Sequence, residues 1–342
     1  MSLALRNTLE QLLQRRDLSE SQAGELLVAL TDPELAPALA GALLAALRSK
    51  GVTADEVRGL AGAMRRLARR PQLSAGAPLV DVVGTGGDGS GSLNLSTGTA
   101  LLAAACGLRV VKHGNRAISS RCGSADLLQA LGLRIPLDEA DAGACLDATG
   151  FTFLFAPHYH PALKALAPIR NALGVRTVFN MLGPLANPAE PAFHLIGAFD
   201  PAAAELLAHT LARMNIERAF VVHGEPGWDE PTPVGPFSLF DVRPGRVTHT
   251  MRDAAAFGVK SCAAGELAGG DAQHNATALR AVFEGEDRGA HRDSLLLGTA
   301  LVLELVGRET DPRRGVAVAA EAIDSGRARE LLARLAGFGG RS

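Results

Sequence analysis

Apolar residues recur at helical spacing over residues 1–70, and the stretch holds no run that alternates as a half-buried strand does. Two capping boxes, at 19–22 and 53–56, each place a hydroxyl residue three positions before Gln or Glu, directly ahead of an apolar periodic segment. Another helix follows two prolines between these boxes and ends near Gly51. The pattern predicts an all-helical N-terminal segment whose apolar faces pack together.

From residue 78 onward, short apolar runs alternate with helical segments. Because strands that alternate with helices pair in parallel, this pattern predicts a mainly parallel sheet flanked by helices. The expected strands are 78–83, 108–111, 151–155, 194–199 and 219–222. The expected helices are 100–106, 124–131, 137–149, 161–173, 202–214, 275–284, 291–306 and 312–324, with a short one after Arg327. Pro244-Gly245, inside the alternating stretch 238–250, predicts an antiparallel hairpin at the sheet edge.

The expected fold class is α/β, with a small all-helical domain at 1–75 and a larger α/β domain at 76–342. Residues 71–77 have the composition of a linker. The stretch near 168–190 holds prolines, glycines and asparagines, which suits a segment that returns to the helical domain. A chain of 342 residues with 47% hydrophobic content is long enough to bury a core in both parts.

The strongest functional signals lie at 78–132, where a strand, a glycine-rich loop, a helix and a second strand follow one another. Glycine occupies positions 84, 86, 87, 89 and 91, and Ser96 or Thr97 is expected to cap the helix. Such a loop binds phosphate, because unpaired amides meet the positive end of the helix dipole there. A glycine cluster alone is more simply a tight turn, but four hydrogen-bonding side chains within ten residues favour a binding loop.

The letters at 84–89, G-x-G-x-x-G, also match a dinucleotide-binding fingerprint. The second strand argues against that interpretation, because it ends in basic and amide side chains where a dinucleotide fold needs an acidic one. Asp88 would repel a phosphate unless a metal ion or ribose hydroxyls lie between them. The pattern therefore indicates a phosphorylated sugar, with amides and Lys112 on phosphate, and Asp88 and Asn94 on hydroxyls or hydrated metal.

An acidic pair and one arginine could also carry chemistry. Asp229 and Glu230 follow the strand at 219–222, and adjacent carboxylates most often form only a charged surface turn. Two points favour a magnesium site: the pair lies beyond the carboxyl end of a strand, and the proposed phosphorylated substrate needs magnesium, which prefers hard oxygen ligands. Arg170 is most simply a surface arginine that packs along its helix. Because no Ser/His/Asp arrangement stands out, no covalent nucleophile is expected, and catalysis would be electrostatic and positional.

Charge and cysteine content limit which partners, metal sites and cellular locations are expected. A net charge of -2 with interspersed signs gives no basic field, so nucleic acid is not an expected partner. The four cysteines show no C-x-x-C spacing, so neither a disulfide framework nor a zinc site is expected. Charges interrupt the N-terminal apolar run, and no apolar stretch has membrane-spanning length. The expectation is a cytoplasmic enzyme without membrane contact.

Several motifs occur in a fixed order and spacing: GTGGD, NLST, KHGNR and GSADLLQALG, then FLFAPHYHPALKALAPIRNALGVRTVFNMLGPLANP at 153–188 and VVHGEPGWDE at 221–230. With these motifs, the chain resembles the anthranilate phosphoribosyltransferase family over nearly its whole length. The resemblance implies transfer of phosphoribosyl from 5-phosphoribosyl 1-diphosphate to anthranilate in tryptophan biosynthesis. It also implies a homodimer that forms through the helical domain.

The resemblance assigns residues to three groups. Those implied for phosphoribosyl diphosphate are Gly84, Gly87, Asp88, Ser92, Asn94, Leu95, Ser96, Thr97, Lys112, His113, Gly114, Asn115, Arg116, Ala117, Ile118, Ser119, Ser120 and Ser124. Those implied for anthranilate are Gly84, Asn115 and Arg170. Ser96, Asp229 and Glu230 are implied to bind two magnesium ions per monomer. For His113, a packed side chain is an equally good interpretation.

Two positions depart from the family pattern. Ser92 stands where threonine is expected but keeps the hydroxyl, whereas Pro231 removes a backbone N–H beside the acidic pair. Four alternatives remain at this point: a pyrimidine nucleoside phosphorylase, a transferase for another arylamine, a nicotinamide-dependent oxidoreductase, and a non-catalytic relative that binds nucleic acid. The KHGNR string and the acidic pair argue against the first, and the absence of a basic stripe against the last.

Overall fold

The computed structural model of the chain describes residues 2–117 and 121–339. Ile118, Ser119 and Ser120, which are expected in the phosphate cradle, lie outside the described residues. Among the helices that are described, none is long and apolar enough to cross a membrane.

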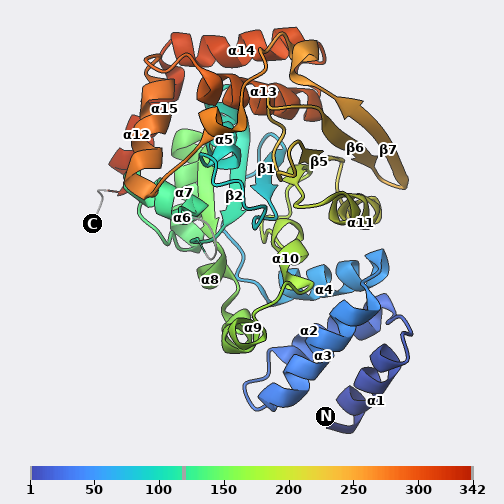
Figure 1. Cartoon of the computed structure of the whole chain (residues 1–342). Helices are drawn as coiled ribbons and strands as arrows, with labels where there is room; N and C mark the ends of the chain where they lie inside the picture. Colours follow the sequence, from blue (N-terminus) through green and yellow to red (C-terminus); the bar gives the residue numbers. More distant parts are fainter. Residues whose placement is uncertain (1, 118–120, 340–342) are drawn as a thin grey trace.

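The N-terminal part is helical, as its apolar spacing predicts. It consists of α1 (Ser2–Leu13), α2 (Glu20–Leu30), α3 (Pro37–Lys50) and α4 (Ala54–Leu67). Both expected capping boxes are confirmed: the Ser19 and Thr53 side chains accept hydrogen bonds from the amides three residues on. In Figure 1 these helices form one end of the molecule, below the sheet.

The described residues form a seven-stranded sheet in the order β3-β2-β1-β4-β5-β6-β7. Its strands are β1 (Leu79–Gly84), β2 (Arg109–Gly114), β3 (Phe151–Phe155), β4 (Phe193–Gly197), β5 (Arg218–Gly224), β6 (Phe237–Arg243) and β7 (Arg246–Arg252). Strands β1 to β5 pair in parallel, and β6 and β7 form the expected antiparallel hairpin. The chain order reverses beside β1, which has β2 on one side and β4 on the other. In an open α/β sheet, ligands bind beyond the strand ends at such a switch point.

Helices cover the sheet as expected, with two corrections. They are α5 (Leu95–Ala105), α6 (Ser124–Ala130), α7 (Glu139–Thr149), α11 (Pro201–Leu211), α12 (Ala272–Phe283), α13 (Ala290–Leu305), α14 (Pro312–Asp324) and α15 (Arg327–Gly339). The prediction that Ser96 or Thr97 caps α5 is wrong, because Asn94 holds the cap position and both hydroxyl residues lie inside the helix. The last helix is not short, since α15 extends over 13 residues.

The chain between β3 and β4 consists of short helical pieces that lie between the sheet and the N-terminal helices (Figure 1). They are α8 (Ala156–Tyr159), a 3₁₀ helix (Pro161–Leu166), α9 (Ala167–Leu173), α10 (Phe179–Leu182) and a second 3₁₀ helix (Gly183–Leu185). The single helix expected over 161–173 is therefore divided. Pro168 explains the division, because a proline fits the first turn of α9 but cannot donate a hydrogen bond to a preceding turn.

The two faces of the sheet belong to different cores. Val82 and Leu195 pack on one side with α5 and α13, whereas Val83 and Ile196 pack on the other with α11. The second core continues through the short helices into α2, α3 and α4. Apolar packing thus joins the N-terminal helices to the face of the sheet beneath the switch point.

Candidate active site

The glycine-rich loop begins directly at the end of β1, at the switch point. Gly86, Gly87, Gly89 and Gly91 all have positive φ angles, between 60° and 75°. Residues with a Cβ rarely adopt this conformation, so the path of the loop depends on glycine. The loop then leads into the first turn of α5, which begins at Leu95.

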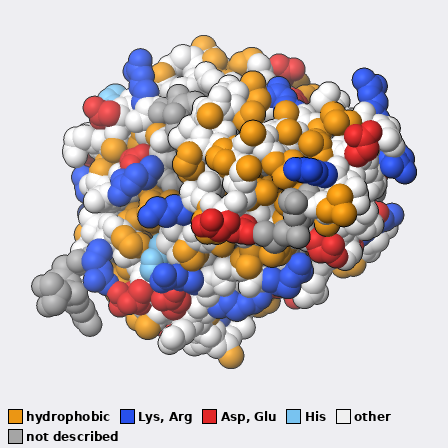
Figure 2. Space-filling model, turned by 90° about the horizontal axis from the view of Figure 1, so that it is seen from below, with side chains coloured by type: hydrophobic (Ala, Val, Ile, Leu, Met, Phe, Trp, Pro, Cys, Tyr) orange, Lys and Arg blue, Asp and Glu red, His pale blue; other side chains and the backbone are white. Residues whose placement is uncertain are grey.

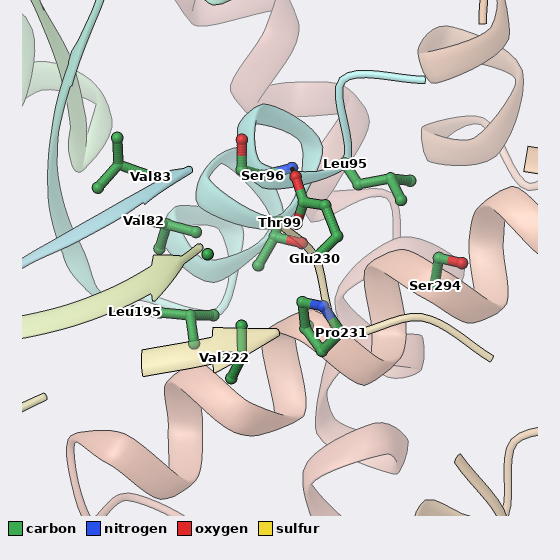
Figure 3. Close-up of a pocket in the computed structure, with 12 residues that line it drawn as sticks. Val82, Val83, Leu95, Ser96, Thr99, Leu195, Val222, Glu230, Pro231 and Ser294 are labelled. Atoms are coloured by element: carbon green, nitrogen blue, oxygen red, sulfur yellow. Dashed lines mark hydrogen bonds between the residues drawn. The ribbon is translucent and has the colours of Figure 1, made fainter. Parts of the chain in front are cut away.

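The structure brings the acidic pair against this loop, although more than 130 residues separate them in sequence. Asp229 Oδ2 accepts a hydrogen bond from the Gly86 amide at 2.6 Å, and Glu230 Oε1 accepts one from the Ser96 amide at 2.9 Å. The Asp229 amide in turn donates to Asp88 Oδ2 at 3.3 Å. Three carboxylates and the N-terminus of α5 therefore meet at one place, and Figure 3 shows Glu230 turned toward that turn of α5.

Glycines at the ends of neighbouring strands make room for the acidic pair. A Cβ on Gly197 of β4 would lie 1.6 Å from the Asp229 carbonyl oxygen, and one on Gly224 of β5 would lie 2.2 Å from that of Glu230. A Cβ on Gly84 of β1 would lie 2.4 Å from Asp229 Oδ2. The motif interpretation included Gly84 but missed the other two, although a glycine that ends each of several strands is a visible signal.

Burial and repulsion perturb the acidic groups. Burial, followed by the charge of Asp88, raises the pKa of Asp229 to about 7. Burial and the charge of Asp229 also raise the pKa of Glu230. Repulsion and burial thus oppose the ionised forms of these groups, Lys112 acts against that effect at Glu230, and a divalent cation would stabilise the ionised forms further.

The oxygen donors fit magnesium. Carboxylates and a serine hydroxyl are hard ligands, and magnesium commonly takes only one or two carboxylates together with water and substrate phosphates. Within the described residues, no group of three or more His, Cys, Asp or Glu is arranged to hold a metal by itself. The residues present thus suit an ion that shares its coordination with a phosphorylated substrate.

Lys112 lies beneath the acidic pair and not on the open loop. It is 2% exposed, and its Nζ donates to the Val82 carbonyl oxygen. Burial lowers its pKa, while Asp81, Glu230 and Asp229 act in the opposite direction. Its ammonium therefore contributes to the site mainly through the electric field.

Sequence reasoning missed Asp81, whose charge acts on Lys112, and Asn187, which holds Asp81. Asp81 is fully buried in β1 and accepts a hydrogen bond from Asn187 Nδ2 at 2.8 Å. Burial raises the pKa of Asp81 to about 6, although Lys112 and the Asn187 bond oppose the change. A carboxylate inside an otherwise apolar strand is the signal that could have identified it.

The segment after β2 is organised by Asp126 of α6, another residue without an assigned role. Its carboxylate accepts hydrogen bonds from the Ala117 amide at 2.9 Å, the Gly123 amide at 3.0 Å and Arg116 Nη1 at 2.8 Å. Burial acts to raise its pKa, but these three donors outweigh it and lower the pKa. Asp126 thereby binds both Ala117 and Gly123, which lie on either side of the expected phosphate cradle in the sequence.

Ser124 and Asn115 also meet in this segment, since Ser124 Oγ donates to the Asn115 carbonyl oxygen at 3.2 Å. Gly114 ends β2 and packs against the same hydroxyl, because a Cβ there would lie 2.3 Å from Ser124 Oγ. The side chain of Asn115 is exposed. The structure thus places Asn115 at the open side of the site.

His113 is a packed side chain in this structure. Its Nδ1 lies 3.1 Å from the Gly183 carbonyl oxygen, and its ring centre lies 5.0 Å from that of His160. Burial, together with His160, lowers its pKa to about 3, so the ring is neutral near pH 7. His113 therefore joins β2 to the short helices that approach the N-terminal part.

The expected hydroxyl-binding residues differ in their surroundings. Asn94 Nδ2 donates to the Cys122 carbonyl oxygen at 2.9 Å, and its Oδ1 accepts from Asn275 Nδ2 at 2.9 Å. The amide of Asn94 thus joins the start of α5 to α12 and to the segment before α6. Ser92 Oγ lies 3.2 Å from Ser90 Oγ, within the loop. Thr97 is 1% exposed and Leu95 is 2% exposed, so both side chains pack inside the fold.

Arg170 lies apart from the acidic cluster, on α9. Its guanidinium carbon is 5.1 Å from the centre of the Phe179 ring, and burial lowers its pKa. Pro231 and Glu230 line the same cavity, which has a volume of about 10 Å³. Figure 3 shows both residues among those around it. The bond from the Ser96 amide to Glu230 is present, so the proline at 231 leaves this contact intact.

An N-terminal helical bundle joined to a sheet that carries a glycine loop and an acidic pair at its switch point defines a class of two-part glycosyltransferases. Residues 6–68 match the family described as "Glycosyl transferase family, helical bundle domain", and residues 76–329 match "Glycosyl transferase family, a/b domain". Within this class, the chain belongs to the anthranilate phosphoribosyltransferase family.

Similar proteins extend over nearly the whole chain. The anthranilate phosphoribosyltransferase of Desulforudis audaxviator is 45% identical over 98% of this chain and 96% of its own length. That of Pelotomaculum thermopropionicum is 43% identical over 98% and 97%. The crystal structure of the Thermus thermophilus enzyme has a TM-score of 0.91 at 40% identity, with coverage of 98% and 99%. The Saccharomyces cerevisiae enzyme in complex with PRPP and Mg has a TM-score of 0.91 at 25% identity, with coverage of 99% and 98%.

Proposed function

We propose that the chain transfers the phosphoribosyl group of 5-phosphoribosyl 1-diphosphate to anthranilate, giving N-(5-phosphoribosyl)anthranilate and diphosphate in tryptophan biosynthesis. The observation that carries the proposal is the contact between the glycine loop and the acidic pair across the switch point. Family membership over nearly the full length supports the same reaction.

Binding of the diphosphate would use the glycine loop, the first turn of α5 and the segment after β2. These parts carry the residues inferred from the motifs, from Gly84 to Thr97 and from Lys112 to Ser124. Ser96, Asp229 and Glu230 would hold magnesium, and we propose two ions per monomer. Bound magnesium would neutralise charge that develops on the leaving diphosphate. The buried ammonium of Lys112 adds positive charge below the same place.

The acceptor would be held by Gly84, Asn115 and Arg170. The planar guanidinium of Arg170 matches the carboxylate of anthranilate, and Asn115 lies at the open side of the site. Because an aromatic amine is neutral at pH 7, these residues need only align it behind the anomeric carbon. Arg170 lies on α9, below the strand ends (Figure 1). The proposal thus requires anthranilate to bind between the short helices and the sheet.

The domain division and the oligomeric state of the protein are part of the proposal. We place the division between domains at 1–75 and 76–342, with 168–190 returning to the helical domain. A homodimer through the helical domain is supported by the exposed apolar side chains Leu3, Leu13 and Val28. Figure 2, seen from below, shows hydrophobic side chains gathered on that face. Light scattering on the purified protein tests this, since a monomeric mass would contradict it.

A cytoplasmic location is supported by the cysteines. All four lie in the described part of the chain and occur there as thiols. Thiols of this kind are typical of a reducing compartment.

The direct test is consumption of anthranilate fluorescence by purified protein in the presence of phosphoribosyl diphosphate, with and without magnesium. Loss of fluorescence that depends on magnesium is the expected result. The variant D229A/E230A should reduce turnover by about 100-fold or more, because it removes the carboxylates that would hold the ion. A matched control is E205A/E217A: Glu205 is exposed on α11, and Glu217 is exposed before β5, at the opposite end of this strand from the acidic pair. Unchanged magnesium-dependent activity in D229A/E230A would reject the role of the pair.

A further inference from the structure

Arg176 contacts the glycine loop from its outer side, although the sequence pattern assigned this residue no role. It lies between α9 and α10, and its side chain is exposed. Its Nη2 donates a hydrogen bond to the Gly87 carbonyl oxygen, and its guanidinium carbon lies 4.2 Å from the centre of the Phe199 ring. A charged donor is therefore fixed against the loop that would bind diphosphate.

Phe199 connects the same arginine to the beginning of the loop. Its amide donates to Thr85 Oγ1 at 3.0 Å, and the Thr85 amide donates to the Gly197 carbonyl oxygen at 2.9 Å. An aromatic face attracts a guanidinium and restricts its direction. Phe199 thus supports Arg176 with its ring while its backbone holds Thr85, two residues before the carbonyl that Arg176 contacts.

A contact to the Gly87 carbonyl can determine how the peptide between Gly87 and Asp88 is oriented. Gly87 has a φ of 74°, and with no Cβ its backbone has little restraint of its own. Because the peptide is planar and trans, turning the Gly87 C=O toward Arg176 turns the Asp88 N–H in the opposite direction. On its other side, the Asp88 carboxylate accepts from the amides of Ser90 at 3.1 Å and Asp229 at 3.3 Å. Arg176 therefore holds the Gly87 carbonyl, while the acidic turn holds the next residue through its carboxylate.

The contact also reaches the N-terminal helices. Arg48, on α3, donates from Nη1 to the backbone carbonyl oxygen of Arg176. A continuous series of hydrogen bonds thus leads from α3 through residue 176 to the glycine loop.

We propose that Arg176 is a positioning residue for phosphoribosyl diphosphate. It holds the glycine loop in the form that binds the diphosphate, and through Arg48 it links that form to the position of α3. The inference rests on the proposed function, because it takes the loop to be the diphosphate site. Arg176 acts through the Gly87 carbonyl and does not need to touch the substrate.

The test compares R176A and R176K with R213A, a control that removes an exposed arginine paired with Asp55 elsewhere on the molecule. Hydrogen exchange of the peptide 85–92, measured without ligands, should be faster in R176A and unchanged in R213A. The KM for phosphoribosyl diphosphate should rise about tenfold in R176A, as expected when a charged hydrogen bond is lost. The KM for anthranilate should stay the same, and R176K should recover part of the loss because it keeps the charge without the planar fork.

A double-mutant cycle tests the link to α3. R48A should raise the KM for phosphoribosyl diphosphate about twofold in the parent chain and have no further effect beside R176A, because coupled residues are not additive. Additive effects would overturn the link to α3.

The remaining outcomes separate this inference from the proposed function. Unchanged exchange and unchanged KM in R176A would overturn the positioning role. Faster exchange in R176A, in a protein whose parent consumes no anthranilate, would support the loop contact and contradict the proposed function.

Discussion

At the scale of single residues, the geometry of the site depends on glycines as much as on charged side chains. The acidic turn packs onto the glycines that end three neighbouring strands, and its carboxylates then reach the amides of the loop and of α5. Asp81 supports the same place from within the sheet, and Asn187 holds its carboxylate. Backbone packing therefore positions the charged groups.

A residue-scale prediction concerns Gly197. In G197A the new Cβ would lie 1.6 Å from the Asp229 carbonyl oxygen, so the acidic turn must move. We expect a stability loss of about 1–3 kcal/mol, as for overpacked cores, together with a marked loss of turnover. Urea unfolding and the fluorescence assay measure both quantities.

Gly265 supplies the control for this substitution. No heavy atom outside its immediate neighbourhood lies within 4 Å of an added Cβ, so G265A should behave as the parent chain does. Parent-like turnover in G197A would show that the acidic turn does not depend on this close contact.

At the scale of elements, the capping signals in the sequence match the observed starts of the helices. The Thr53 cap opens α4, and the Glu56 carboxylate of the same capping box also accepts from Lys50 Nζ at 2.9 Å and from the Leu18 amide at 2.8 Å. Glu56 is fully buried. One cap therefore joins α4 to α3 and to the start of α2.

The corresponding prediction is that T53A lowers the free energy of unfolding by about 1 kcal/mol, because the first amides of α4 lose an acceptor. T53S should keep most of the stability, since serine caps equally well. Thr8 bonds only its own helix, so T8A is the matched control. Chemical denaturation compares the three variants, and equal losses in T53A and T8A would contradict a special role for this cap.

At the scale of the whole molecule, the junction between the sheet and the N-terminal helices buries three histidines. Burial lowers the pKa of His113 and of His194 to about 3, and that of His160 to about 4. Each is then neutral in the folded state where the unfolded chain binds a proton, between the folded pKa and about 6.5. Their contribution to stability is complete above pH 6.5 and decreases as the pH falls. The raised pKa values of Asp81, about 6, and of Asp229, about 7, have the opposite effect on stability, and so has the raised pKa of Glu230. These buried carboxyl groups keep a proton above about pH 4, where the unfolded chain loses it.

These carboxyl groups offset the histidines, so the test compares variants and not the pH dependence of the parent chain alone. Replacing His194, which is fully buried, by leucine removes one histidine contribution, so the free energy of unfolding of the parent chain should fall relative to that of H194L by about 1 kcal/mol per pH unit between pH 6.5 and 5. Replacing the exposed His209 by glutamine is the matched control and should leave the pH dependence of the parent chain unchanged. Urea midpoints at several pH values provide the measurement. A difference between H194L and the parent chain that stays constant over this range would contradict the buried neutral state of His194.

The sequence by itself determined the order of the elements, two capping boxes, the antiparallel hairpin and the fold class, because periodicity, caps and turns are local properties. Its motifs also predicted a glycine loop and an acidic pair at strand ends, which the structure brings together. Only the tertiary structure decided that the Asn94 side chain bonds to Cys122 and Asn275, that Lys112 and His113 are buried, and that Arg176 contacts Gly87. These features join residues that are distant in sequence, so packing of whole elements determines them and no local pattern records it.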